Sequence, residues 1–117
     1  MSYGFNSVTE LFSVTVPGLT TTITNKITTI NAGGQPVTLN VTVTNDPRNP
    51  GPGVNWSIGT ATANCTTACG TLSNQMPFSV VYTPPVAIPS VPFNMPVIQA
   101  NSITDPTEFD RNSFTIQ

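Results

Sequence analysis

The sequence predicts a single all-β domain, and three observations lead to this prediction. Residues that favour strands dominate the chain, with 20 Thr, 12 Val, 8 Ile and 9 aromatic side chains among 117 residues. Twelve prolines leave few stretches long enough for a helix of several turns. Apolar and polar residues alternate in several short segments, which is typical of strands with one buried face. A chain of this length supplies one hydrophobic core and not two.

The clearest alternation lies in residues 37–44, where Val37, Leu39, Val41 and Val43 share one face and polar residues share the other. This pattern predicts a half-buried antiparallel strand. The same period of two predicts four further strands, at residues 12–16, 54–58, 78–83 and 111–117. Weaker patterns raise the expected total to seven or eight strands, and they lie at residues 21–31, 69–73 and 95–103.

The spacing of turn residues narrows the all-β prediction. Clusters of Gly, Pro, Asn and Asp separate the strands at intervals of roughly 8 to 12 residues. Together with a lone tryptophan, Trp56, in the third clear strand, this spacing predicts an immunoglobulin-like Greek-key β-sandwich of seven to eight strands. We expect its core to include Trp56, Val41, Val43, Tyr82 and Phe114.

Two segments do not fit the strand pattern. Residues 1–10 show no alternation, which predicts a flexible arm or linker remnant ahead of one domain at residues 11–117. Residues 84–96 contain five prolines and cannot form a central strand. We expect this segment to be an extended connection across the bottom of the sandwich, with four apolar side chains tucked against it: Val86, Ile88, Val91 and Phe93.

The composition argues against several classes of function. Only 7% of the residues are charged, and three cations, Lys26, Arg48 and Arg111, are too few to neutralise a row of phosphates, so nucleic-acid binding is not expected. The chain has no histidine, which removes Ser/His and Cys/His nucleophilic sites and the usual zinc ligand sets. No apolar run approaches the length of a membrane span. The sequence therefore predicts a protein that is not an enzyme, needs no cofactor and does not insert into a membrane.

Four of the five acidic residues gather at one end of the predicted sandwich. The loop after residue 44 and the loop after residue 103 emerge at the same end of this topology, so Asp46 should approach three other acids: Asp105, Glu108 and Asp110. One hypothesis is a calcium site built from carboxylate, amide and carbonyl oxygens. The alternative, which we favour, is that the Asp-Pro pairs start turns through their side chains, while Arg48 and Arg111 neutralise the neighbouring acids.

Seven short motifs between residues 30 and 117 resemble, in order and spacing, those of bacterial Ig-like domains. They are VTVTNDP (41–47), GVNWSI (53–58), ACGTLS (68–73), VVYTPP (80–85), IPS (88–90), VIQANSITDPT (97–107) and SFTIQ (113–117). The resemblance implies a non-catalytic module that often occurs in tandem arrays within large exported or cell-surface proteins. Such modules act as spacers or adhesive units.

The two cysteines, Cys65 and Cys69, lie four positions apart. A disulfide between them would close a loop of five residues and contribute at most roughly 2 kcal/mol through loop entropy. Their spacing is not that of a CxxC motif, so redox catalysis is not indicated. The resemblance includes paired cysteines at this place, and an exported location would oxidise them, so it implies a disulfide in preference to free thiols.

These observations lead to one functional hypothesis and two alternatives. The first is a structural or adhesive module of a secreted or cell-surface bacterial protein, whose partners are neighbouring Ig-like domains, copies of itself, or a surface glycan or protein ligand. The second is a self-assembling subunit of an extracellular filament or of a phage or virus particle, joined through the arm or an uncovered sheet edge. The third is a carbohydrate-binding module, for which the threonine-rich segment 19–30 offers a face but the chain offers few aromatic side chains.

Overall fold

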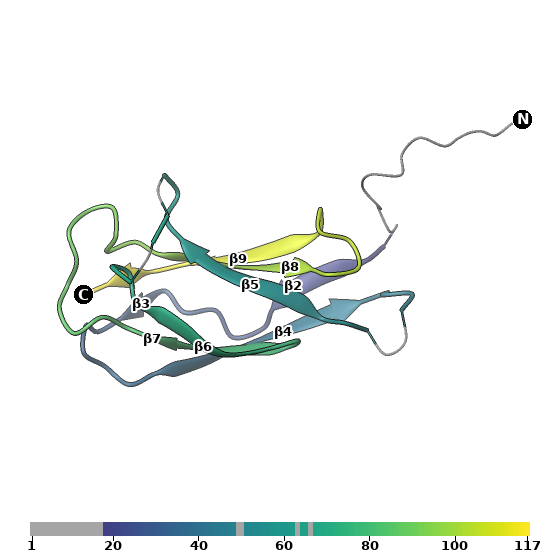
Figure 1. Ribbon diagram of the computed structural model, residues 1–117, viewed down its shortest axis with the longest axis horizontal. Coiled ribbons are helices and arrows are strands. Elements are labelled where there is room, and N and C mark those ends of the chain that lie inside the picture. The colour runs from purple at the N-terminus through teal and green to yellow at the C-terminus, as the bar shows by residue number, and fades with distance from the viewer. Residues whose placement is uncertain (1–17, 49–50, 63, 66) are drawn as a thin grey trace, which may run out of the picture.

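The computed structural model is an all-β protein, which confirms the predicted class (Figure 1). The structure describes residues 18–48, 51–62, 64–65 and 67–117, so the predicted arm at 1–10 and strand at 12–16 lie outside it. The described residues contain no helix. Their strands are β2 (Thr20–Ile23), β3 (Thr29–Ile30), β4 (Val37–Thr44), β5 (Val54–Gly59), β6 (Thr71–Met76), β7 (Ser79–Thr83), β8 (Val97–Ser102), β9 (Phe109–Ser113) and β10 (Thr115–Ile116).

Two antiparallel sheets form the two layers of a sandwich-like arrangement (Figure 1). One sheet has four strands in the order β2-β4-β7-β6, and the other has three in the order β5-β8-β9. The strands β4 and β5 follow each other along the chain but lie in different sheets. Within the sheets Leu39 lies opposite Val80, and Trp56 lies opposite Ala100.

The chain changes layer between β2 and β3. Strand β2 pairs with β4 in the four-stranded sheet, whereas β3 runs parallel to β10, which follows β9 of the other sheet. Side chains of β9 bond the backbone of this crossing segment. The Asn112 amide accepts a hydrogen bond from the Ile27 amide nitrogen at 2.9 Å and donates one to the Ile27 carbonyl at 2.7 Å. Asn112 is buried, and it joins the two layers where the backbone ladders leave a gap.

The hydrophobic core lies between the layers and draws on both sheets. Its four-stranded side includes Leu39, Val41, Val80 and Tyr82, and its three-stranded side includes Trp56, Ile98 and Ala100, with Phe114 at the end of β9. Trp56, Val41, Tyr82 and Phe114 are thus all buried, and Val43 is half-buried against the same cluster. The alternation along β4 explains this arrangement, because every second side chain of a strand faces the same way.

Two buried aromatic residues also carry polar atoms, and each atom has a partner. The indole nitrogen of Trp56 donates to the carbonyl of Met76 at 3.0 Å, which links β5 to β6 across the layers. The hydroxyl of Tyr82 donates to the carbonyl of Cys69 at 2.7 Å, and burial raises the pKa of this hydroxyl. The Tyr82 ring meets Phe114 edge to face, with 5.0 Å between the ring centroids.

The strand predictions agree with the structure to different degrees. The strand predicted at 37–44 is confirmed with the same bounds, and the strand predicted at 54–58 is one residue longer. The weak segment 21–31 divides into β2 and β3, because the chain changes layer inside it. The segment predicted at 111–117 divides into β9, which begins at Phe109, and β10, and the strand expected at 69–73 lies further on as β6.

The expected packing of residues 84–96 is wrong for three of the four side chains. The segment forms no strand, as its prolines require, but Val86 is 92% exposed, Val91 is 72% exposed and Ile88 is also exposed, whereas Phe93 is half-buried. The segment contains turns, since the Phe93 amide bonds the Ser90 carbonyl and the Met95 amide bonds the Pro92 carbonyl. In Figure 1 it forms the wide loop at the left-hand end.

Candidate functional site

The two loops expected to meet at one end of the molecule do meet. The Thr104 hydroxyl, from the turn between β8 and β9, bonds the Asp46 carboxylate at 2.9 Å and 3.0 Å. Asp46 also accepts a hydrogen bond from the Arg48 amide, two residues on, at 2.9 Å. This hydrogen bond from residue i+2 to residue i starts a turn, which is the role that the favoured alternative to a calcium site gives to an Asp-Pro pair.

Asp105 has the same role in a buried position. Its carboxylate accepts hydrogen bonds from the Thr107 amide at 3.1 Å and from the Thr107 hydroxyl at 2.6 Å, while its own amide donates to the Ser102 hydroxyl. The Glu108 amide donates to the Asp105 carbonyl, so the acid sits inside a turn tied at several points. A fully buried carboxylate with these partners is a structural element of the turn between β8 and β9.

Asp110 faces the layer crossing. Its carboxylate accepts a hydrogen bond from the Ile23 amide at 2.8 Å and forms an ion pair with Lys26 at 3.0 Å. Burial raises the pKa of this carboxyl, but the hydrogen bonds from Ile23, Lys26 and the Arg111 amide and the charge of Lys26 lower it more, so its pKa lies below the ordinary value. The cation that neutralises Asp110 is therefore Lys26 and not the expected arginines.

The positions of these acids do not support the calcium hypothesis. Within the described ranges, no three His, Cys, Asp or Glu residues come together in a group that could hold a metal ion. Asp46, Asp105 and Asp110 each accept hydrogen bonds from their own neighbourhood instead. The acidic end is thus a set of separate turn and crossing contacts.

The two cysteines form the disulfide that the resemblance implied. Cys65 and Cys69 are bonded, with their Cα atoms 6.0 Å apart, in the connection between β5 and β6. Cys69 is fully buried, and its carbonyl receives the Tyr82 hydroxyl. The hydrogen bond at Cys69 therefore joins the bridged connection to the core residue Tyr82.

The outer face of the three-stranded sheet carries a groove that the sequence did not reveal. We call it the outer groove; it has a volume of about 380 Å³ and is lined by Ser57, Ile58, Gly59, Thr60, Ala61, Asn64, Val97, Gln99, Arg111 and Ser113. The guanidinium of Arg111 donates its Nε hydrogen to the Gln99 amide oxygen at 2.7 Å. It also lies over the ring of Phe109, at 4.8 Å from the ring centre.

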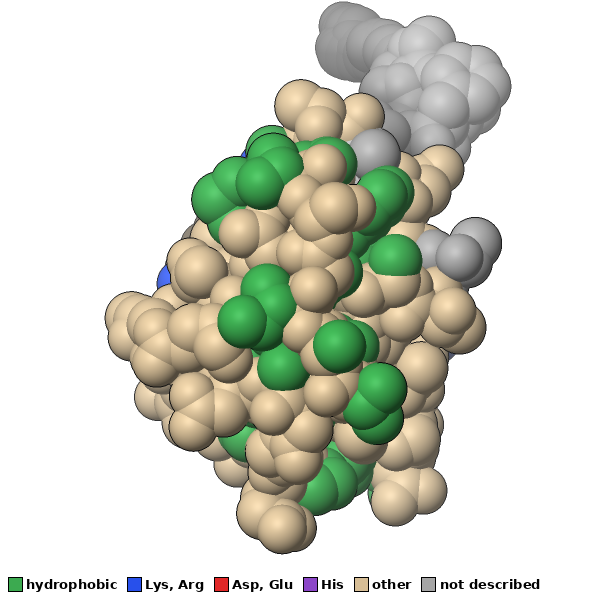
Figure 2. Space-filling model, turned by 90° about the vertical axis from the view of Figure 1, so that its left-hand side faces the viewer, with side chains coloured by type: hydrophobic (Ala, Val, Ile, Leu, Met, Phe, Trp, Pro, Cys, Tyr) green, Lys and Arg blue, Asp and Glu red, His purple; other side chains and the backbone are tan. Residues whose placement is uncertain are grey.

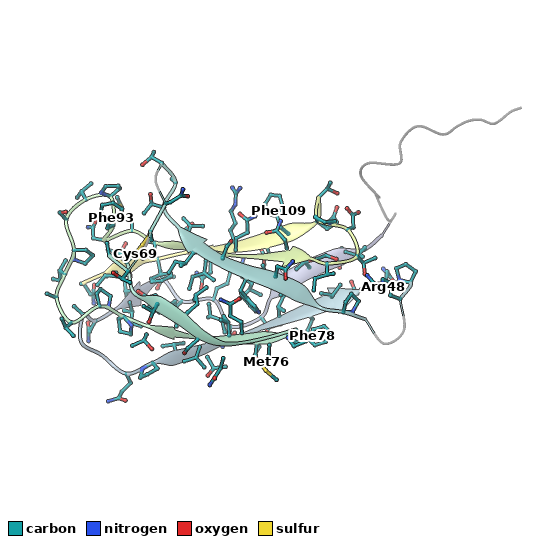
Figure 3. The ribbon with its side chains drawn as sticks, in the orientation of Figure 1. Arg48, Cys69, Met76, Phe78, Phe93 and Phe109 are labelled. Carbon is teal, nitrogen blue, oxygen red and sulfur yellow. A yellow bond between two sulfur atoms is a disulfide. The ribbon has the colours of Figure 1, made fainter. Side chains whose placement is uncertain are left out.

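Sequence alternation could have placed Arg111 and Gln99 on the solvent faces of their strands, but not beside each other. Their contact depends on the register of β8 and β9, in which Gln99 lies opposite Arg111. Figure 3 shows Phe109 over this layer, on the opposite side of the molecule from Met76 and Phe78.

The end opposite the acidic loops, which we call the apolar end, carries exposed apolar side chains. Four exposed side chains of the connection between β7 and β8 lie there, namely Val86, Ile88, Val91 and Met95. Figure 2 views this end directly and shows hydrophobic side chains distributed over it, with no acidic side chain in view. None of the described segments forms an apolar helix long enough to cross a membrane.

Comparison with known proteins adds no relative. The chain matches no protein-family model, and neither the curated proteins nor the solved structures contain a match to it.

Proposed function

We propose that the chain is an immunoglobulin-like β-sandwich module that acts as a structural or adhesive unit of a secreted or cell-surface bacterial protein, without catalytic activity. The observation that carries this proposal is the strand order. Immunoglobulin constant-type domains place strands A, B, E and D in one sheet and C, F and G in the other. The orders β2-β4-β7-β6 and β5-β8-β9 follow this scheme, with β2 as strand A and β9 as strand G.

The positions of the sequence motifs support the proposal. VTVTNDP covers the end of β4 and the following turn, and GVNWSI opens β5. VVYTPP covers the end of β7, and VIQANSITDPT covers β8 with the turn after it. The motifs thus lie on strands and on the turns that follow them, and in the turns a fold constrains residue type through φ and side-chain hydrogen bonds. The disulfide supports an oxidising compartment, as for an exported protein.

The path of the chain suits a spacer. β2 starts at the end that carries the acidic loops, and Gln117 lies at the opposite, apolar end (Figure 1). Gln117 is fixed there, because its amide bonds the Ile30 carbonyl and its carbonyl accepts from the Ala32 amide. A force applied to the two ends acts along β2 and β10, so it shears the β2-β4 and β3-β10 ladders, whose hydrogen bonds must then break together.

Pulling a single molecule by its two ends tests the spacer function. The full chain, held at its N-terminus and at Gln117, should unfold in one step at a higher force than the same chain held at Gln117 and at Val86, changed to Cys. Val86 is exposed at the same end as Gln117, so the second geometry peels strands one bond at a time. Equal unfolding forces in the two geometries would count against a spacer.

One observation favours a second candidate function, that of a self-assembling subunit. Large apolar side chains exposed in one region of a surface can mark a contact site, and the connection at the apolar end presents four of them. If copies associate through this end, the full chain should elute earlier from a sizing column as concentration rises. The double variant Val86→Ser, Ile88→Ser should remain monomeric. A single monomer peak for the unchanged chain at all concentrations would contradict this candidate.

A further inference from the structure

The outer groove has a shape that arises from local sequence. Residues 57, 97, 99, 111 and 113 alternate outward along β5, β8 and β9, whereas Gly59 contributes no side chain to the same face. Gly59 also pairs with Asn64 in an isolated antiparallel bridge, so the chain turns back beside the sheet after β5. The missing side chain leaves the floor of the groove low, and Thr60, Ala61 and Asn64 form one wall.

Arg111 is held in one orientation at this groove. The Nε hydrogen bond to Gln99 and the stacking on Phe109 fix the guanidinium plane, while the two terminal nitrogens make no hydrogen bond to any residue that the structure describes. A guanidinium fixed in this way loses little entropy when it binds a ligand.

Arg111 also has no carboxylate partner among the residues that the structure describes. The neighbouring acid, Asp110, points to the other face of β9, where it is engaged by Lys26 and Ile23. Among the described residues, that ion pair is the only salt bridge. The outer groove therefore offers a pair of free donors of the geometry that matches a carboxylate.

The remainder of the lining selects the kind of molecule that carries this carboxylate. Asn64, Ser57 and Ser113 provide amide and hydroxyl groups, which complement the hydroxyls of a sugar. The Gln99 amide accepts from Arg111 and donates to Asn101 at 2.8 Å, which leaves it one further hydrogen to donate. The groove lies on the face of the sheet, over the middle strand β8, which is paired on both sides, whereas extended peptides join the free edge of an outer strand such as β5 or β9. The polar lining and the position on the sheet face favour a saccharide over a peptide.

We propose that the outer groove binds a carboxylate-bearing sugar, with the terminal nitrogens of Arg111 on the carboxylate. The groups of Gln99, Asn64 and Ser57 then face the ring hydroxyls. This inference goes beyond the spacer function, because a spacer needs no ligand; it would make the module adhesive toward acidic glycans. Its failure would leave the mechanical test unaffected.

The test uses trigalacturonate as the acidic probe and its methyl ester as the uncharged match. The full chain, labelled with nitrogen-15, is titrated with each probe at low ionic strength, and the Arg111 Nε signal and the amides of residues 57–60, 97–99 and 111–113 are followed. We expect trigalacturonate to shift these signals with a Kd on the order of 1 mM, and the ester to bind at least about tenfold more weakly.

Three variants complete the experiment. Arg111→Gln should weaken trigalacturonate binding at least about tenfold. Gly59→Val should also weaken it, since the new side chain fills the floor while the arginine remains. The matched control, Arg48→Gln, removes a cation from the acidic end and should bind like the unchanged chain. The amide spectrum of each variant shows whether it is folded.

The proposal is overturned if trigalacturonate does not bind, if the ester binds equally well, or if Arg111→Gln retains full affinity in a folded protein. It is also overturned if a peptide that ends in a free carboxylate, acetyl-Gly-Gly-Gly, binds at the same residues with higher affinity than trigalacturonate.

Discussion

At the scale of single residues, short amide side chains complete the backbone hydrogen bonding of this fold. The Asn25 side chain accepts a hydrogen bond from the Asn40 amide at 2.8 Å and donates one to the Thr38 carbonyl at 2.7 Å. It thus continues the hydrogen bonding along β4 beyond the end of β2. Asn112 does the same for the layer crossing. A chain with only 7% charged residues thus uses its asparagines inside the structure as well as on the surface.

The Asn112 contact predicts a stability change. Asn112→Ala removes the side-chain partner of two partly buried Ile27 backbone groups, so the free energy of unfolding should fall by about 2 to 3 kcal/mol. The control Asn55→Ala changes an exposed asparagine on β5 and should alter it by less than about 0.5 kcal/mol. Urea unfolding of both variants measures the difference. Equal effects would remove Asn112 as the clamp between layers.

Asp110 predicts a dependence of stability on pH. The pKa of Asp110 is lowered from 3.8 in the folded chain, so as pH falls the unfolded chain takes up the proton first. The stabilisation is therefore fully present above the pKa of the unfolded chain. It is lost as pH falls through the folded pKa. Between pH 6 and pH 3 the free energy of unfolding should therefore fall less steeply in Asp110→Asn than in the unchanged chain. Parallel curves for the two proteins would contradict the assignment.

At the scale of elements, alternation is sufficient to locate strands that have one clear buried face. Residues 37–44 are an example, because their apolar side chains all lie in the core or against it. The period of two does not reveal where a strand changes partner, so it could not divide residues 21–31 at the layer crossing. It also could not place the irregularity of β6, where Asn74 adopts a φ of +47° and the register with β7 shifts.

The site was less predictable than the strands. The meeting of Asp46 with the turn after β8 follows from topology and was anticipated. The use of each carboxylate by a nearby amide or hydroxyl depends on the turn geometry, and the pairing of Gln99 with Arg111 depends on register. Neither is encoded in the spacing of residues along the chain.

The contact between Gly53, just before β5, and Pro77, just after β6, predicts that two glycines differ in how much stability they lose on substitution by alanine. Gly53 has a φ of +82°, and a Cβ there would overlap the Pro77 carbonyl, which accepts the Val54 amide. Gly53→Ala should therefore lower the free energy of unfolding by at least about 3 kcal/mol.

Gly33 provides the matched control for this prediction. Its φ is +71°, but the nearest atom to an added Cβ is 3.5 Å away, so Gly33→Ala should lose only about 1 kcal/mol through backbone strain. Thermal and urea unfolding of both variants compare them. A smaller loss of unfolding free energy in Gly53→Ala than in Gly33→Ala would show that the contact with Pro77 does not restrict residue 53.

At the scale of the whole molecule, charge and apolar surface occupy different places. The acidic loops lie at one end and the exposed residues of the connection 84–96 lie at the other. The outward side chains of the four-stranded sheet are uncharged and rich in threonine, with Thr22 opposite Thr42 as an example. The outer groove is an exception to the uncharged sheet faces, because Arg111 brings to it a positive charge that no described carboxylate pairs.

The proposed module depends on the strand order more than on any other feature, and nuclear Overhauser contacts between backbone protons measure that order directly. In the isotope-labelled full chain we expect β4 to contact β2 on one side, as Thr42 to Thr22, and β7 on the other, as Leu39 to Val80. We also expect β3 to contact β10. Contacts that pair β4 with β5 as a hairpin would contradict the immunoglobulin-like arrangement and the function proposed from it.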